Sequence, residues 1–159
     1  MFPEYAHSVW DEVVGQSRAI AQLTNAATSA VHAYLFIGPP GCTKNEAARA
    51  FAALVMAGVD DPDHRDARLV LAGEHPDVRE VERVGATKVL ILHEFHLLSA
   101  DGAARLLKSL EEPPPDTVFV VLADQVPPEL VTIASRCVRI DFAELSEAAL
   151  REALEARGV

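Results

Sequence analysis

The sequence predicts one α/β domain built on a mostly parallel sheet. The chain has 159 residues, a length that suits one compact domain, and 50% of them are apolar, enough for a substantial core. Short runs of branched and aromatic apolar residues alternate with longer segments whose apolar residues recur at helical spacing. That alternation is typical of strands and helices in a parallel sheet covered on both faces.

In the first half of the chain, each predicted element rests on a local pattern. Unbroken apolar runs predict buried strands, recurring apolar residues predict helices, and an aspartate-rich stretch predicts an exposed loop. Gly73 is predicted to end a short helix. The elements expected after the segment 9–16 are a helix carrying Ile20, Leu23 and Ala27, a strand over 34–37, a helix over about 44–56, a loop over 60–66 and a short helix over 69–72.

Capping residues and prolines delimit the elements of the second half. Ser99 is a predicted helix N-cap, and Pro113 to Pro115 forbid that helix to continue. Continuous branched runs again predict buried strands. The elements expected are a weak strand over 78–82, a strand over 89–92, a helix from Ser99, a strand over 117–123, a helix over 130–135, a strand over 138–142 and a helix over 146–157.

The connection that leads to the strand at 89–92 is short. A parallel crossover needs a dozen or more residues, and Gly85-Ala86 suits the centre of a two-residue type II′ turn. The sequence therefore predicts an antiparallel hairpin between 81–84 and 87–90, which places 78–84 at a sheet edge. A connection without a crossover helix would leave apolar surface bare beside 89–92, from which we expect self-association or a partner subunit.

Charge and composition exclude several classes of function. The formal net charge is −10, whereas autonomous nucleic-acid binders carry a basic footprint. Cys42 and Cys137 lie far apart in the sequence, which excludes a disulfide framework and a cysteine zinc site. The chain has neither an apolar run long enough to cross a bilayer nor a signal-peptide pattern at its start. We therefore expect a cytoplasmic protein without membrane contact.

The strongest motif is a phosphate-binding loop between a predicted strand and a predicted helix. In that context, backbone N–H groups and the helix N-terminus bind phosphates. Lys44 stands where the phosphate lysine belongs, but Thr43 replaces a glycine, and Asn45 replaces the hydroxyl residue that holds Mg²⁺. The candidate cofactor-binding residues of the loop are Gly38, Pro39, Pro40, Gly41, Cys42, Thr43, Lys44 and Asn45.

A second motif predicts that hydrolysis is lost. His93 and Glu94 follow the strand at 89–92, where P-loop ATPases place an aspartate for Mg²⁺ and then a glutamate that orients water. A neutral imidazole is a poor ligand for Mg²⁺. With both metal ligands replaced, we expect no magnesium-dependent hydrolysis and a vestigial Glu94. Binding of ATP or ADP stays open.

The spacing of His93, Glu94 and His96 raises the alternative of a transition-metal site. Zinc needs a third protein ligand and an organised second shell, for which His64, His75 and the aspartates of 60–66 are the candidates. Solvated histidines at a strand end are the ordinary explanation. We therefore predict no metal site.

Two further stretches are more specific than the phosphate loop: Glu-Glu-Pro-Pro-Pro at 111–115 and the tripeptide Ser-Arg-Cys at 135–137. With them the chain resembles the clamp-loader subunits of bacterial DNA polymerase III, a branch of the AAA+ ATPases, and the delta-prime type most closely. The resemblance covers residues 9–142 almost continuously, and both Walker motifs depart from the family pattern.

The resemblance implies a function exerted through contacts between subunits. In that family the arginine of Ser-Arg-Cys reaches into the ATP site of a neighbour, which makes Arg136 a candidate catalytic residue in trans. Val13 and Val14 match the adenine-side segment. A chain without metal ligands fits the non-hydrolysing stator of the assembly. Implied partners are other clamp-loader subunits or further copies of the chain, with the sliding clamp and DNA reached only through the assembly. An active P-loop ATPase and a nucleotide-binding regulator without hydrolysis stay open as alternatives.

The resemblance also implies an AAA+ three-layer sandwich and a division of the chain. Residues 1–144 correspond to a shortened P-loop domain with one crossover helix missing, and 145–159 to the first helix of a truncated lid. The region 59–68 lacks the cysteine zinc module that such subunits commonly carry.

Overall fold

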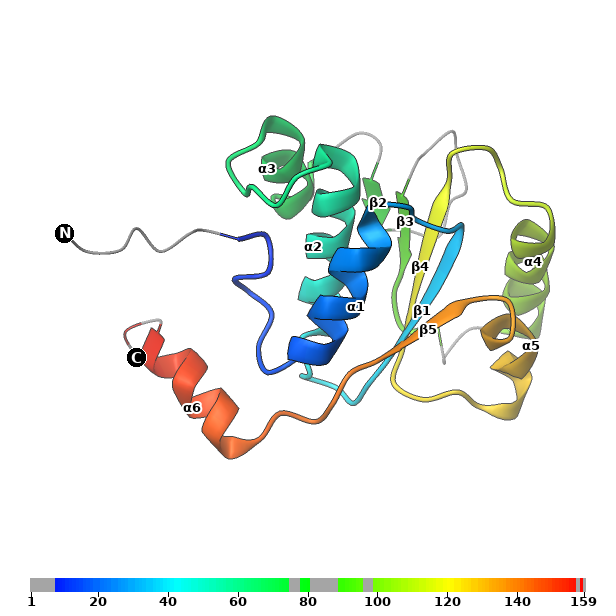
Figure 1. Ribbon diagram of the computed structural model, residues 1–159. Helices are drawn as coiled ribbons and strands as arrows, with labels where there is room; N and C mark the ends of the chain where they lie inside the picture. The colour runs from blue at the N-terminus through cyan, green and yellow to red at the C-terminus, as the bar shows by residue number, and fades with distance from the viewer. Residues whose placement is uncertain (1–7, 75–77, 81–88, 96–98, 157, 159) are drawn as a thin grey trace.

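A five-stranded parallel sheet forms the middle layer of the protein (Figure 1). The computed structural model describes residues 8–74, 78–80, 89–95, 99–156 and 158. The strand order is β2-β3-β4-β1-β5, and all four pairings are parallel. The strands are β1 (Ala33–Ile37), β2 (Val78–Glu80), β3 (Val89–Leu92), β4 (Val118–Ala123) and β5 (Val138–Asp141).

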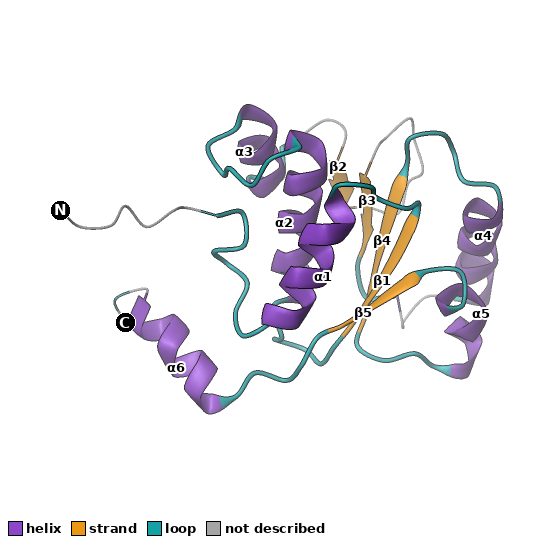
Figure 2. Cartoon of the chain, viewed as in Figure 1, coloured by secondary structure: helices purple, strands orange, loops and turns teal. Residues whose placement is uncertain are grey.

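Helices cover both faces of the sheet, as Figure 2 shows. On one face lie α1 (Ser17–Ala27), α2 (Lys44–Ala57) and α3 (Arg65–Leu71). On the other lie α4 (Ala100–Glu111) and α5 (Val131–Ala134), which directly follows the 3-10 turn η2 (Pro128–Leu130). The last helix, α6 (Glu147–Ala156), lies apart from the sheet. The predicted α/β class with a three-layer sandwich is confirmed.

The central strands β1 and β4 and most of β3 are buried on both faces, which explains their continuous apolar runs. Along β1, Tyr34 and Phe36 belong to the core on the α2 side, and Leu35 belongs to the core on the α4 side. The ring of Tyr34 meets that of Phe51 edge to face with centroids 4.9 Å apart, a favourable aromatic geometry. This rigid centre fixes the loops at both ends of the strands.

The predicted antiparallel hairpin is wrong. Strand β2 pairs with β3 in parallel, with Val78 opposite Val89 and Glu80 opposite Ile91. The twelve-residue rule assumes a full strand and a crossover helix, whereas β2 is only three residues long. The chain therefore returns by only about 7 Å along the strand direction, which a short segment can span. The predicted turn at Gly85-Ala86 and the missing crossover helix fall on 81–88, outside the described residues.

Two smaller expectations are also corrected. Helix α3 begins at Arg65, inside the predicted loop, because Nδ1 of His64 accepts the N–H of Asp66 and caps the helix. The described residues of β3 show little of the apolar exposure expected there, since Val89, Leu90 and Ile91 are each at most 1% exposed and Leu92 is partly exposed. Ser99 caps α4 as predicted, with its Oγ accepting the N–H of Gly102. Among the described residues, no helix is long and apolar enough to span a bilayer.

Candidate functional site

The phosphate loop occupies the predicted place, between the end of β1 and the start of α2. A Cβ on Gly38 would lie 2.7 Å from both the Cys42 Sγ and the Phe142 Cβ, so only glycine fits there. Gly41 has a φ of +80°, a conformation that glycine adopts without strain. Packing therefore requires a glycine at Gly38, and the backbone conformation favours one at Gly41.

Thr43 stands in place of the missing glycine and keeps the glycine's backbone conformation. Its φ is 66° and its ψ is 22°, in the left-handed region that β-branched residues rarely enter. Its Oγ1 accepts the N–H of Val14 at 3.0 Å and donates to the Val14 carbonyl at 3.3 Å. Through these two bonds the Thr43 side chain connects the loop to the backbone of Val14, which belongs to the predicted adenine-side segment.

Gln16 fastens the same segment to two other parts of the chain. Its Nε2 donates to the carbonyl of Cys42 at 3.0 Å and to that of Ala143 at 2.7 Å, and its Oε1 accepts the N–H of Ala143 at 2.9 Å. The residue is only 4% exposed, and all these bonds join segments far apart in sequence. A buried amide with satisfied partners fixes the relative positions of the segments that it connects.

Lys44 is paired with a carboxylate of its own chain. Its Nζ lies 2.8 Å from Oδ1 of Asp124, and the side chains of Lys44 and Asp124 are 9% and 32% exposed. Asp124 follows β4, the neighbour of β1, so the two residues meet where both strands end. Asp124 was not predicted from the sequence. A polar residue directly after a buried strand was the signal that could have found it.

The positions at which P-loop ATPases hold Mg²⁺ and orient water lie at the surface of this chain. Asn45, His93 and Glu94 are all exposed, and Glu94 has a φ of 49°. Within the described part of the chain, no group of three histidine, cysteine, aspartate or glutamate side chains could hold a metal ion. His75 and His96, considered for zinc, lie outside that part. In nucleotide sites Mg²⁺ is commonly held by one or two carboxylates together with phosphates and water, and neither Asn45 nor His93 offers a carboxylate.

Arg136 lies just before β5 begins, at the amino ends of the strands, whereas the phosphate loop lies at their carboxyl ends. Its Nη1 donates to the carbonyl of Thr132 at 2.8 Å, and its Nη2 lies 3.1 Å from Oε1 of Glu111. The side chains of Arg136 and Glu111 are 36% and 51% exposed. The two motifs specific to the resemblance therefore meet in space, since Glu111 opens one of them and Arg136 centres the other. Within one chain, the structure does not bring Arg136 to the phosphate loop.

The two thiols are held in the protonated form. Burial raises the pKa of the Cys42 thiol, and the nearby Lys44 ammonium opposes that rise. Burial raises the pKa of the Cys137 thiol to about 11. Since the thiolate is the reactive form, neither cysteine is a nucleophile near neutral pH.

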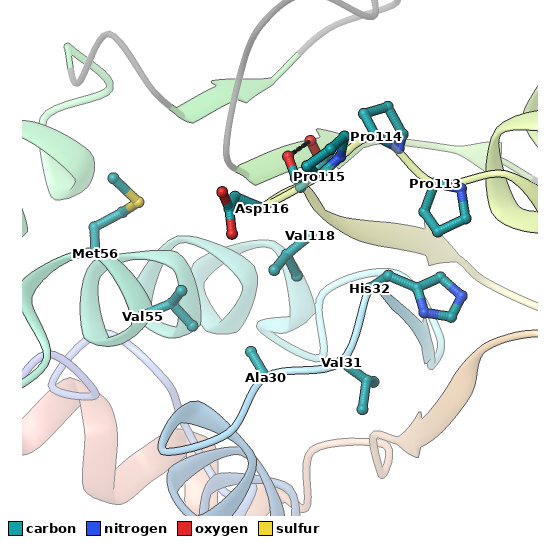
Figure 3. A pocket seen from close by; sticks show the side chains of 11 residues that line it. Ala30, Val31, His32, Val55, Met56, Pro113, Pro114, Pro115, Asp116 and Val118 are labelled. Carbon is teal, nitrogen blue, oxygen red and sulfur yellow. Dashed lines mark hydrogen bonds between the residues drawn. The ribbon is translucent and has the colours of Figure 1, made fainter.

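A pocket of about 560 Å³ lies at the edge of the sheet where β1 and β4 begin (Figure 3). Val55 and Met56 of α2 line one side of it, and Pro113 to Pro115 line another. The prolines of the Glu-Glu-Pro-Pro-Pro stretch thus form part of its wall. Because α2 begins at the phosphate loop and ends at this pocket, a ligand held here would not meet Lys44.

Comparisons with known proteins agree with these motifs. The family model described as "DNA polymerase III, delta subunit" matches residues 80–146. DNA polymerase III subunit tau of Bacillus subtilis is 32% identical over 89% of this chain and 30% of its own length. Subunit delta' of Pseudomonas aeruginosa is 32% identical over 68% of this chain and 42% of its own length, and that of Bacillus subtilis is 30% identical over 77% and 45%. The chain spans less than half the length of these relatives.

Proposed function

The chain belongs to the family of bacterial DNA polymerase III clamp-loader subunits, and on that premise we propose that it acts in DNA replication as a non-hydrolysing subunit. Its contribution is Arg136, offered to the ATP site of a neighbouring subunit. The observation that carries this proposal is the contrast between a phosphate lysine paired inside the fold and an arginine held at the surface. The partners are other clamp-loader subunits, with the sliding clamp and DNA reached through the assembly in the cytoplasm.

The absence of intrinsic hydrolysis follows from the chemistry of the loop. Asn45 and His93 replace both protein ligands of Mg²⁺, and both side chains are exposed. P-loop hydrolysis depends on that metal to neutralise charge on the transferring phosphoryl group. Purified protein should release no phosphate from Mg-ATP above the level of a Lys44→Ala variant. Turnover that disappears in that variant would support the active ATPase instead.

Arg136 is held loosely enough to leave its intramolecular partners. An exposed ion pair such as Arg136–Glu111 contributes at most about 1 kcal/mol. Charge-assisted bonds from a guanidinium to a polyphosphate are stronger and are made through two donors at once. A neighbour's triphosphate can therefore take Arg136 from Glu111. Until then, Glu111 and the Thr132 carbonyl hold the guanidinium at the surface.

The test is ATP turnover by an assembled complex. Residues 1–159 would be joined to the remaining segments of a full-length relative and combined with its partner subunits. An arginine supplied in trans is worth about 10³–10⁵ in rate, so Arg136→Ala should suppress the neighbour's turnover by orders of magnitude while assembly persists. Arg136→Lys should restore little, because an ammonium cannot reproduce the planar fork.

Arg139→Ala is the matched control. Arg139 is also an exposed arginine, paired with Asp141 at 2.8 Å on the neighbouring strand β5, but it lies outside the Ser-Arg-Cys tripeptide. It should leave turnover unchanged. If an assembled Arg136→Ala complex hydrolyses ATP at the unmutated rate, the role assigned to Arg136 is wrong.

A further inference from the structure

The phosphate loop already holds an anion, and that anion is a side chain of the same protein. The carboxylate of Asp124 lies 2.8 Å from the Lys44 ammonium, the usual distance of a charge-assisted hydrogen bond. The Lys44 side chain is 9% exposed and emerges from the first residue of α2. A carboxylate from the end of β4 therefore holds the lysine that a phosphate would need.

The two anions cannot share Lys44 without a large loss of affinity. A phosphate oxygen in contact with the ammonium would lie about 4 Å from the Asp124 carboxylate. At that separation and an effective dielectric constant of about 20, the repulsion between two unit charges lowers affinity about a thousandfold. The phosphate would otherwise have to displace Asp124 from a partner that has almost no access to water.

The other side of the loop is also bonded within the chain. Thr43 Oγ1 bonds both the N–H and the carbonyl of Val14, and Gln16 Nε2 bonds the carbonyl of Cys42. Thr43 retains these bonds although its backbone is in a conformation that favours glycine. The loop is thus fixed by contacts that need no ligand.

We infer that Asp124 is the residue that closes this loop to polyphosphates, and that its carboxylate takes the place of the ligand anion. The inference rests on the proposed non-hydrolysing function and extends it from loss of the metal to exclusion of the anion. It predicts that one change of charge, Asp124→Asn, creates an anion site on an otherwise unchanged loop.

The experiment measures binding of inorganic pyrophosphate to the isolated chain by calorimetry at constant ionic strength. Asp124→Asn keeps the shape of the side chain and removes its charge, so affinity should rise at least a hundredfold above wild type. Adding Lys44→Ala to that variant should abolish the gain. Asp141→Asn is the matched control, because it removes one exposed carboxylate from the end of β5 and should change nothing.

Each outcome decides the inference. Equal affinity of wild type and Asp124→Asn for pyrophosphate overturns it, as does an equal gain in Asp141→Asn, which would reflect net charge alone. If Asp124→Asn unfolds because Lys44 lacks a counterion, pyrophosphate should restore the folded circular dichroism spectrum, and failure to do so also overturns it. The proposed function is tested separately by the turnover of Arg136→Ala complexes, so either idea can fail while the other stands.

Discussion

Lys44 and Arg136 lie at opposite ends of the strands of one sheet, and they differ in how firmly each side chain is held. Lys44 is nearly buried, and its ammonium is paired with Asp124, whereas Arg136 is over a third exposed and is held by Glu111 and one carbonyl. Breaking a buried pair by removing one partner costs about 3–5 kcal/mol, but an exposed pair contributes at most about 1 kcal/mol. Loss of the Lys44 partner should therefore cost the fold far more than loss of the Arg136 partner, as expected if Arg136 is kept for contact with another chain.

The largest expected effect tests that contrast in stability. Lys44→Ala should lower the free energy of unfolding by about 2–4 kcal/mol, somewhat less than for a fully buried pair because Asp124 is a third exposed. Arg136→Ala should lower it by less than about 1 kcal/mol. Urea unfolding followed by the fluorescence of Trp10, the single buried tryptophan, measures both. Equal losses of unfolding free energy in the two variants would show that Lys44 and Arg136 are held equally firmly.

The second prediction concerns the thiol beside the exposed arginine. Burial raises the pKa of Cys137 from an ordinary value near 9 to about 11, so much less of it is thiolate at pH 8 than in the unfolded chain. The folded state keeps a proton that the unfolded state loses. This stabilisation is therefore complete below pH 9 and disappears as the pH rises through 11. Iodoacetamide labelling of Cys137, followed by peptide mass spectrometry, should show a midpoint near pH 11. A midpoint near pH 9 would show that water reaches the Cys137 thiol beside Arg136.

The third prediction separates strain from bonding at Thr43. Thr43→Ala removes two hydrogen bonds to Val14 but keeps a left-handed backbone, so stability should fall by about 1–2 kcal/mol. Thr43→Gly loses the same bonds but also removes strain of about 1–2 kcal/mol, and it should remain close to wild type. Chemical denaturation of the two variants gives the comparison. If Thr43→Ala is as stable as wild type, the hydrogen bonds to Val14 contribute nothing to the stability of the fold.

The elements that the sequence predicted correctly were those with a local pattern of their own. Continuous apolar runs located β1, β3 and β4, and the Ser99 cap and the prolines at 113–115 delimited α4. The predicted antiparallel pairing of β2 was wrong. A parallel connection must span the length of the strand that it returns along, and a strand of three residues makes that length short. Asp124 and Glu111 were not identified as partners of the two cations, since each pair joins elements that only the fold brings together.

The smallest expected effect tests how freely Arg136 is held. Glu111→Gln should change the stability of the isolated chain by less than about 0.5 kcal/mol, and the change should vanish in 0.5 M salt, because exposed pairs are screened over roughly a Debye length. Glu112→Gln, one residue further along the same stretch, is the control. The cost of Asp124→Asn should persist at the same salt concentration, since water and ions reach Lys44 poorly. A large, salt-independent cost of Glu111→Gln would show that Arg136 is fixed to its own chain as firmly as Lys44 is. A neighbour's phosphate could then not take it.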